Sequence, residues 1–153
     1  MVNYTPKMGQ EGPENLEQSI ESLVIKKFSY LLPDNPIETA IRAVIQSTLN
    51  GLPVLTTDMK PLGYLSEKDC LKIAIDSRYH NSETGKVENY MYTECHVIPE
   101  NTSIFEAIEE FTKVWYHGFP VTDPATSKVT GMIFRKDLLA YIDRQPVTTW
   151  FKK

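Results

Sequence analysis

The stretch Gly63-Tyr64-Leu65-Ser66-Glu67-Lys68-Asp69 reads as a short strand that runs directly into a helix. Ser66 stands where a helix N-cap is expected, and Asp69 follows three residues later, inside the first turn. The chain builds the same junction a second time as Gly131-Met132-Ile133-Phe134-Arg135-Lys136-Asp137. A junction that occurs twice in one chain predicts a duplicated fold.

Further matches surround the two junctions. Ala40-Ile41 recurs as Ala107-Ile108, 67 positions later (107 minus 40), and Gly51-Leu52-Pro53-Val54 recurs at the same interval as Gly118-Phe119-Pro120-Val121. The junctions themselves lie 68 positions apart (131 minus 63), so one additional residue falls in the turn before the later copy. The pattern predicts two units, each with the order strand, helix, strand, strand, helix.

Periodicity and turn signals place the elements of the first unit. We expect an apolar-faced helix over Leu16 to Val24, a strand over Phe28 to Leu32, and a helix from Ile37 that Asn50-Gly51 ends. After these we expect two strands and a helix, over Leu52 to Thr56, Leu62 to Leu65 and Glu67 to Ile75.

The predicted organisation has five parts. These are a flexible N-terminal arm at 1–14, a first repeat at 15–78, a polar linker at 79–86, a second repeat at 87–143 and a C-terminal tail at 144–153. Trp150 and Phe151 predict that the tail docks onto this chain or another. One repeat buries too little apolar surface to be stable alone, so we expect the two to pack as one globule.

Composition narrows the function. The chain has 153 residues, 41% of them hydrophobic, and a net charge of -4 without a block of lysines or arginines, which argues against nucleic acid or an anionic membrane as a partner. The absence of a signal peptide and of long apolar runs favours a cytoplasmic protein.

Cys70 and Cys95 are too few for a disulfide framework, and no cysteine or histidine pair has metal-ligand spacing. No nucleophile motif supports Ser66, so we expect neither metal nor catalytic residues, and small molecules and other proteins remain as partners.

The junction at Ser66 has two interpretations. The free N–H groups and positive dipole end of a helix N-terminus attract an anion such as phosphate, and the Asp69 carboxylate can accept hydrogen bonds from the two hydroxyls of a ribose. Alternatively, Ser-x-x-Asp before an apolar run only starts a helix. In the second copy Phe134 removes the hydroxyl while Asp137 remains, which suggests a use for the carboxylate beyond capping, although the helix dipole also explains it.

The order and duplication of these motifs resemble the cystathionine-β-synthase (CBS) domain pair, or Bateman module, in its stand-alone bacterial and archaeal form. The resemblance runs from about Ile20 to about Ile142 and rests on the proline after the first strand, the Gly-x-Pro-Val motif and the Gly-x-x-Ser-x-x-Asp junction. It implies an α/β fold of tandem β-α-β-β-α repeats with pseudo-twofold symmetry. It also implies that an adenine nucleotide such as AMP, ADP or ATP lies in a cleft between the repeats, in sites assembled crosswise.

Carried over residue by residue, the resemblance predicts two sites. In the first, the phosphate- and ribose-binding residues of one repeat meet the base-binding residues of the other: Ser66, Asp69 and Tyr64 with Tyr92, Tyr116, His117 and Gly118. The second site joins residues at the second junction to residues of the first repeat: Asp137 and Arg135 with Lys26 or Lys27, Leu49, Asn50 and Gly51. Because Phe134 replaces the hydroxyl there, we expect the second site to be impaired or different.

The resemblance implies a regulatory function. The module would bind an adenine nucleotide between its repeats, require no cofactor, carry out no catalysis itself and signal to an effector protein. The family commonly forms flat homodimers through its amphipathic helices, and we expect a homodimer here. The competing hypothesis is a ligand-free dimerisation and interaction scaffold whose junction motifs merely cap helices.

Overall fold

The computed structural model describes residues 16–80 and 85–145. The predicted N-terminal arm, positions 81–84 of the predicted linker, and most of the predicted tail with Trp150 and Phe151 lie outside the described residues. Within the described ranges, no helix combines the length and the apolar character needed to cross a membrane.

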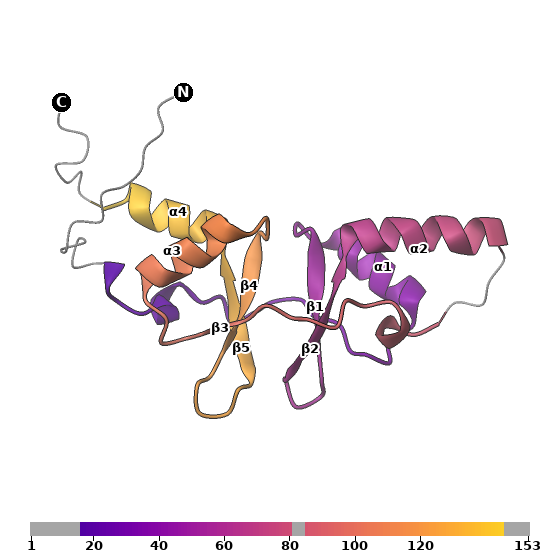
Figure 1. The fold of residues 1–153 in the computed structure, drawn as a ribbon, viewed down its shortest axis with the longest axis horizontal. Helices are drawn as coiled ribbons and strands as arrows, with labels where there is room; N and C mark the ends of the chain where they lie inside the picture. Colours follow the sequence, from indigo (N-terminus) through magenta and orange to yellow (C-terminus); the bar gives the residue numbers. More distant parts are fainter. Residues whose placement is uncertain (1–15, 81–84, 146–153) are drawn as a thin grey trace, which may run out of the picture.

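The elements follow one another in two similar series (Figure 1). The first series is η2 (Ile20–Leu23), α1 (Ile37–Gln46), β1 (Gly51–Leu55), β2 (Pro61–Ser66) and α2 (Glu67–His80). The second series is η3 (Val87–Asn89), β3 (Ile98–Pro99), α3 (Ile104–Lys113), β4 (Gly118–Thr122), β5 (Val129–Phe134) and α4 (Arg135–Asp143).

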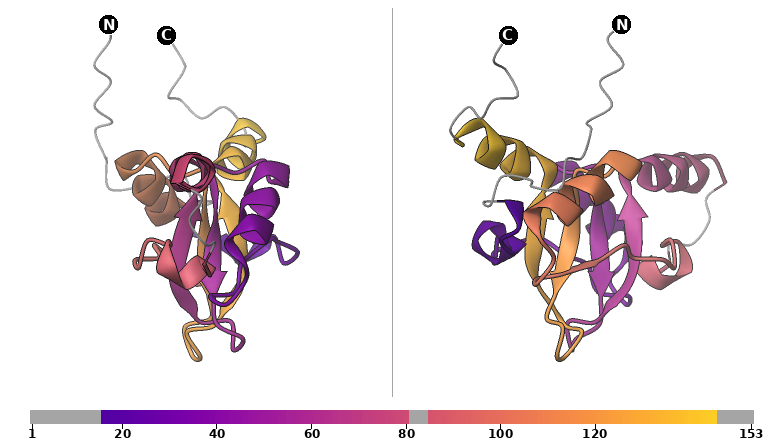
Figure 2. Two further views of the ribbon diagram at one scale, coloured as in Figure 1. Left: turned by 90° about the vertical axis from the view of Figure 1, so that its right-hand side faces the viewer. Right: turned by 60° about the vertical axis from the view of Figure 1, so that its left-hand side comes forward.

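Each half of the molecule is built on an antiparallel hairpin. β1 pairs with β2 and β4 pairs with β5 in matching registers, so that Gly51 faces Ser66 and Gly118 faces Phe134. Figures 1 and 2 show helices α1 to α4 on one side of the molecule and the turns of both hairpins on the opposite side. Both strand-to-helix junctions therefore lie toward the helical side, at equivalent places in the two halves.

The first strand of each half is very short, and in the first half it is shorter than predicted. In place of a strand over Phe28 to Leu32, Leu31 alone forms a parallel bridge with Val54. The Leu31 N–H donates to the Pro53 carbonyl, and the Leu31 carbonyl accepts from the Leu55 N–H, both at 2.9 Å. Its counterpart β3 has only two residues and runs parallel to β4. A proline without an N–H group follows closely in both halves and limits the ladder.

Helix bounds also differ from the predictions. α1 ends at Gln46, ahead of Asn50-Gly51, because the Ser47 hydroxyl accepts from the Leu49 N–H at 3.0 Å and offers the chain a local turn. α2 continues past Ile75 to His80, into the segment predicted as linker, since no proline or glycine stops it there. The helix expected over Leu16 to Val24 is only the four-residue 3-10 helix η2.

Two apolar cores, one in each half, are both completed by the other repeat. Ile20, from the first repeat, is buried in the core of the second half, and its N–H donates to the Thr102 carbonyl at 2.9 Å. Val87, from the second repeat, is buried in the core of the first half, and its N–H donates to the Asn35 carbonyl at 3.0 Å. These tertiary contacts replace the amphipathic helix that periodicity predicts around Ile20.

Two backbone crossings mark the boundary between the repeats. Tyr64 in β2 and Tyr92 exchange N–H···O bonds of 2.9 and 2.8 Å, and Met132 in β5 and Ile25 exchange bonds of 2.9 and 2.8 Å. Because Tyr64 and Met132 hold equivalent places in the two hairpins, Tyr92 and Ile25 are equivalent too. Each boundary thus joins a hairpin of one repeat to the early segment of the other.

Glycines make these crossings possible. A Cβ atom at Gly63 would overlap the carbonyl oxygen of Tyr92, and one at Gly131 would overlap that of Ile25. The glycine that opens each junction motif is therefore required by the backbone that passes over it.

Candidate functional site

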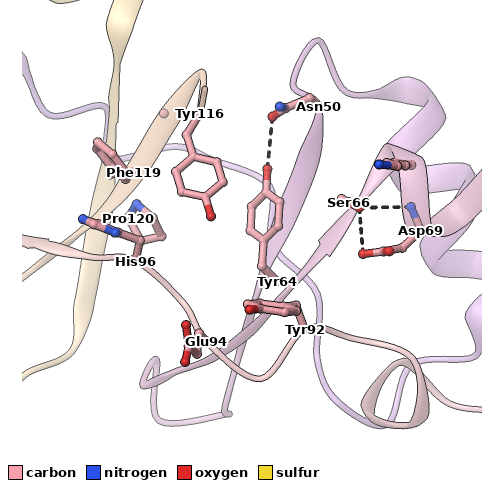
Figure 3. A pocket seen from close by; sticks show the side chains of 12 residues that line it. Asn50, Tyr64, Ser66, Asp69, Tyr92, Glu94, His96, Tyr116, Phe119 and Pro120 are labelled. Atoms are coloured by element: carbon pink, nitrogen blue, oxygen red, sulfur yellow. Dashed lines mark hydrogen bonds between the residues drawn. The ribbon is translucent and has the colours of Figure 1, made fainter. Parts of the chain in front are cut away.

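A cavity of ≈ 490 Å³ opens between the repeats at the first junction (Figure 3). Both repeats supply its lining: Asn50, Tyr64, Ser66, Lys68 and Asp69 from the first, and Tyr92, Glu94, His96, Tyr116, Gly118, Phe119 and Pro120 from the second. Aromatic rings dominate the side toward the second repeat, and the polar start of α2 forms the other side. Such a concave, partly apolar cavity with a few polar groups is typical of a small-molecule site.

Ser66 and Asp69 are bonded to each other at the start of α2. The Ser66 Oγ accepts from the Asp69 backbone N–H at 3.0 Å and donates to Asp69 Oδ2 at 2.7 Å. The serine is thus a helix N-cap, as the capping interpretation expects. Asp69 Oδ1 has no protein hydrogen bond within the described part of the chain, so the carboxylate retains an acceptor for a ligand.

Tyr64 lies in the middle of the cavity. Its hydroxyl donates to Asn50 Oδ1 at 3.3 Å, and its ring lies 6.1 Å from the Tyr116 ring at an interplanar angle of 49°. Burial, and then the nearby Tyr116 and Cys95, raise the pKa of Tyr64 above its ordinary value. The phenol is therefore neutral at physiological pH and can still donate a hydrogen bond.

Tyr92, Glu94 and His96 line the cavity at alternate positions of one extended segment. Side chains at such intervals share a face of extended backbone. The His96 ring packs on Phe119 with 4.7 Å between ring centroids, and its Nε2 lies 3.3 Å from Glu110 Oε2. Hydrogen bonding to Lys113 is the main cause that lowers the pKa of Glu110.

Both thiols are poor nucleophiles in this environment. Burial raises the pKa of Cys70 to about 11, with a further contribution from the neighbouring Asp69, and burial raises the pKa of Cys95 to about 11. Because the thiolate is the reactive form, neither side chain is activated. Among the described residues, no group of three or more histidine, cysteine, aspartate or glutamate side chains is arranged to hold a metal ion.

A family model described as "CBS domain" matches residues 20–76 and 87–144. The chain belongs to the CBS-domain family. Because the model matches twice, the predicted α/β fold of tandem CBS repeats is confirmed, and the two halves of the molecule form a CBS pair.

Solved structures have the same fold. CBSX2 from Arabidopsis thaliana, which has been crystallised in complex with AMP, is similar with a TM-score of 0.68 and 16% identity, covering 82% of this chain and 96% of CBSX2. A hypothetical conserved protein from Geobacillus kaustophilus is similar with a TM-score of 0.72 and 19% identity, covering 84% of this chain and 98% of that protein. At these identities the likeness shows the fold alone.

Two longer enzymes contain a similar segment. Inosine-5'-monophosphate dehydrogenase of Thermoplasma acidophilum is 28% identical over 119 residues, which are 78% of this chain and 22% of the enzyme. The Aquifex aeolicus enzyme of the same name is 26% identical over 139 residues, which are 90% of this chain and 27% of the enzyme. The CBS pair thus spans only a minor part of these relatives.

The CBS fold brings together most residues predicted for the first site. All but one line the cavity: Ser66, Asp69, Tyr64, Tyr92, Tyr116 and Gly118. His117 does not line it, and the His117 carbonyl instead accepts from the Arg135 N–H at 2.9 Å. The role of these residues in binding a ligand stays a prediction.

Asn50 lines this cavity, whereas the family resemblance assigned it to the second site. Its side chain accepts from the Tyr64 hydroxyl, and its carbonyl accepts from the Glu67 N–H at 2.9 Å. The reason is the β1–β2 pairing, which places the residue before Gly51 beside the start of α2.

The other residues predicted for the second site lie outside this cavity: Asp137, Arg135, Lys26, Lys27, Leu49 and Gly51. At that junction Phe134 precedes α4 without a side-chain cap. A Cβ atom at Gly118 would lie 2.7 Å from Phe134 Cδ1, so the ring covers this glycine. The two strand-to-helix junctions of the CBS pair therefore differ: the first has a serine cap and the second has an aromatic ring.

Sequence reasoning missed Glu94 and His96 as lining residues. No local pattern marked them, because the segment from Tyr92 to His96 contains neither a recognised motif nor helical periodicity. Phe119 and Pro120 belong to a recognised motif, but their position on the cavity wall depends on the pairing of β4 with β3 and β5.

Proposed function

We propose that this CBS pair is a regulatory module that binds an adenine nucleotide, AMP, ADP or ATP, between its repeats and signals the occupancy of that site to an effector protein. One observation carries the proposal: in a single cavity of ≈ 490 Å³, the Ser66–Asp69 end of one repeat meets Tyr92 and Tyr116 of the other. The AMP complex of the similarly folded CBSX2 supports it.

The cavity gives a nucleotide one favourable orientation. The Lys68 ammonium and the positive end of the α2 dipole attract the phosphate. Asp69 Oδ1 then accepts from a ribose hydroxyl, while Oδ2 keeps its bond to Ser66. The base extends among the tyrosine rings on the opposite side, whose faces stack on a purine.

Such a ligand would change how the two repeats are arranged relative to each other. The phosphate and ribose contact the first repeat, and the base contacts the second, so binding favours arrangements in which both sets of contacts form. A ligand shifts an equilibrium between two arrangements only by the difference in its affinity for them. The effector protein would recognise the arrangement that the nucleotide favours.

The substitution Asp69→Ala tests the site. AMP or ATP should raise the melting temperature of the wild type, since a ligand at a hundredfold excess over Kd stabilises the folded state by about 2.7 kcal/mol. The variant should lose this shift. The melting temperature of the unliganded variant should also fall, because the lost hydrogen bond to Ser66 contributes about 0.5–1.5 kcal/mol to the stability of the folded state. The quantity to compare is therefore the shift that the ligand causes in each protein.

Asp76→Ala provides the matched control for this experiment. Asp76 is an exposed carboxylate later in α2 and lies outside the cavity, so the variant should keep the full nucleotide shift. If the wild type itself responds to no adenosyl compound at millimolar concentration, the proposal is wrong.

A second candidate function is a ligand-free dimerisation and interaction scaffold. The mutual hydrogen bonds of Ser66 and Asp69 favour it, because they cap α2 without any ligand. Under this function Asp69→Ala would only weaken the start of the helix, and binding of the effector protein would not depend on nucleotide.

We also propose that the module is a homodimer assembled through its helices. Leu71, Ile75 and Tyr79 recur at every fourth position of α2 and are 69%, 50% and 79% exposed, and Leu139 on α4 is 67% exposed. An apolar stripe on the outside of a helix is typical of a covered surface. Because Leu71 and Leu139 hold equivalent places in the two repeats, a second copy can meet the stripe with the same face.

A further inference from the structure

Glu94 places a carboxylate in the cavity that has no partner in the protein. It lines the cavity beside Tyr92 and His96, as Figure 3 shows. Within residues 16–80 and 85–145, its side chain has no hydrogen bond or ion pair, whereas the neighbouring His96 contacts Glu110. An ionised carboxylate only accepts hydrogen bonds, so a ligand group that meets Glu94 must carry an N–H or O–H.

The position of Glu94 is set from both sides. Tyr92 is fixed by its two backbone hydrogen bonds to Tyr64, of 2.9 and 2.8 Å. His96 is fixed by its ring contact with Phe119, at 4.7 Å between centroids. Glu94 lies midway in this extended segment and shares its cavity-facing side.

Charge orients a nucleotide relative to Glu94. Lys68 lies with Ser66 at the start of α2, and Glu94 comes from the other repeat. A phosphate beside Glu94 would meet a like charge, whereas beside Lys68 it meets an opposite charge and the positive end of the helix dipole. The phosphate therefore occupies the α2 end, and the base is the part of the ligand that faces Glu94.

We infer that Glu94 accepts a hydrogen bond from the exocyclic amino group of the base and so selects a 6-amino purine over a 6-oxo purine. AMP presents an amino group at position 6, whereas IMP presents a carbonyl oxygen, which a carboxylate repels. This inference rests on the proposed function, because it requires a purine nucleotide in the cavity. It adds the residue that distinguishes one purine from another.

The equivalent crossing in the other half provides an internal comparison. Ile25 is bridged to Met132 as Tyr92 is bridged to Tyr64, so Lys27, two residues after Ile25, is the counterpart of Glu94. The charge at this position is thus inverted between the two halves. Because a lysine cannot accept from an amino group, selection of a 6-amino purine would be specific to the cavity that Glu94 lines.

Isothermal titration of AMP and of IMP into the wild type and Glu94→Gln tests the inference. The glutamine has the same shape, but its amide can donate to a carbonyl oxygen. We expect the wild type to bind AMP more tightly than IMP, and the ratio of the two affinities to fall by about tenfold or more in the variant, as expected when a charge-assisted hydrogen bond is lost. Glu88→Gln changes an exposed glutamate of η3, outside the cavity, and should keep the wild-type ratio.

The possible results separate this inference from the proposed function. If AMP binds the wild type but Glu94→Gln keeps the wild-type ratio, or if the wild type does not distinguish AMP from IMP, the role of Glu94 is wrong and nucleotide binding stands. If neither nucleotide binds the wild type, both fail. Equal melting temperatures of the unliganded wild type and variant would show that the change in ratio does not come from unfolding.

Discussion

At the scale of single residues, one short motif meets both packing and chemical demands. Gly63 leaves room for the backbone of the other repeat, because a Cβ atom would overlap the Tyr92 carbonyl oxygen. Ser66 and Asp69, a few positions later, carry the hydroxyl and carboxylate that face the cavity. The same crossing therefore holds the repeats together and fixes the distance between the two sides of the proposed site.

The substitution Gly63→Ala should lower the free energy of unfolding by about 1–3 kcal/mol, the usual cost of overpacking, because the strands must separate to admit the methyl group. Urea denaturation measures this change. Gly131→Ala, at the equivalent crossing, should have a similar effect. Unchanged midpoints in both variants would contradict the close approach of the two backbones.

Residues of the site could be predicted where a motif defines them along the chain. Ser66 and Asp69 stand at a recognisable junction, and Tyr116 and Gly118 directly precede a recurring proline motif. Glu94 could not be found in this way, because its direction depends on a backbone pairing between Tyr64 and Tyr92 that no local pattern encodes.

At the scale of elements, α2 has an inner and an outer apolar side. Cys70 is buried in the core of the first half and Ile73 packs against it, while Leu71 and Ile75 point outward. The inner side stabilises the monomer fold, and the outer side is left for the proposed homodimer.

The substitution Leu71→Lys should convert the homodimer into a monomer while the fold is retained, because Leu71 is 69% exposed and contributes little to the core. Size-exclusion chromatography with light scattering measures the mass, and circular dichroism checks the fold. Glu88→Lys adds a lysine in the 3-10 helix η3, outside the apolar stripe of α2, and should leave the mass unchanged. A wild type that is monomeric at all concentrations would contradict the proposed dimer.

Element order was predictable and element bounds were less so. The repeat of Gly-x-Pro-Val and of the junction motif specified both hairpins, because these motifs lie at strand ends. The end of α1 was not predicted, since it depends on a hydrogen bond from the Leu49 N–H to the Ser47 hydroxyl. The length of the helix around Ile20 was overestimated. The apolar side chain of Ile20 packs in the core of the second half and does not mark the face of a long helix.

At the scale of the whole molecule, the two repeats exchange segments. Ile20 completes the core of the second half and Val87 completes the core of the first. Each half therefore needs residues from both sequence repeats, and we expect the CBS pair to unfold as one cooperative unit rather than as two independent domains.

The substitution Ile20→Ala should lower the free energy of unfolding by about 2–5 kcal/mol, the range for removing a large buried aliphatic side chain. Unfolding should still occur in one transition, and native-state hydrogen exchange should show the loss of protection in α3 and β4 of the other repeat. Ile45→Ala, at a position that is 74% exposed, should change stability by less than about 0.5 kcal/mol. A loss of protection confined to α1 and β1 would contradict the packing of Ile20 in the core of the second half.

The exchange of core segments between the repeats also sets an order of events during protein synthesis. A ribosome delivers the N-terminal repeat first. That repeat lacks Val87 of its own core until the second repeat begins to emerge, and Ile25 has no backbone partner until Met132 in β5 has been made. The segment around Ile20 and Ile25 therefore lacks these partners when it is first synthesised, and its pairing with Met132 can form only after β5 has left the ribosome.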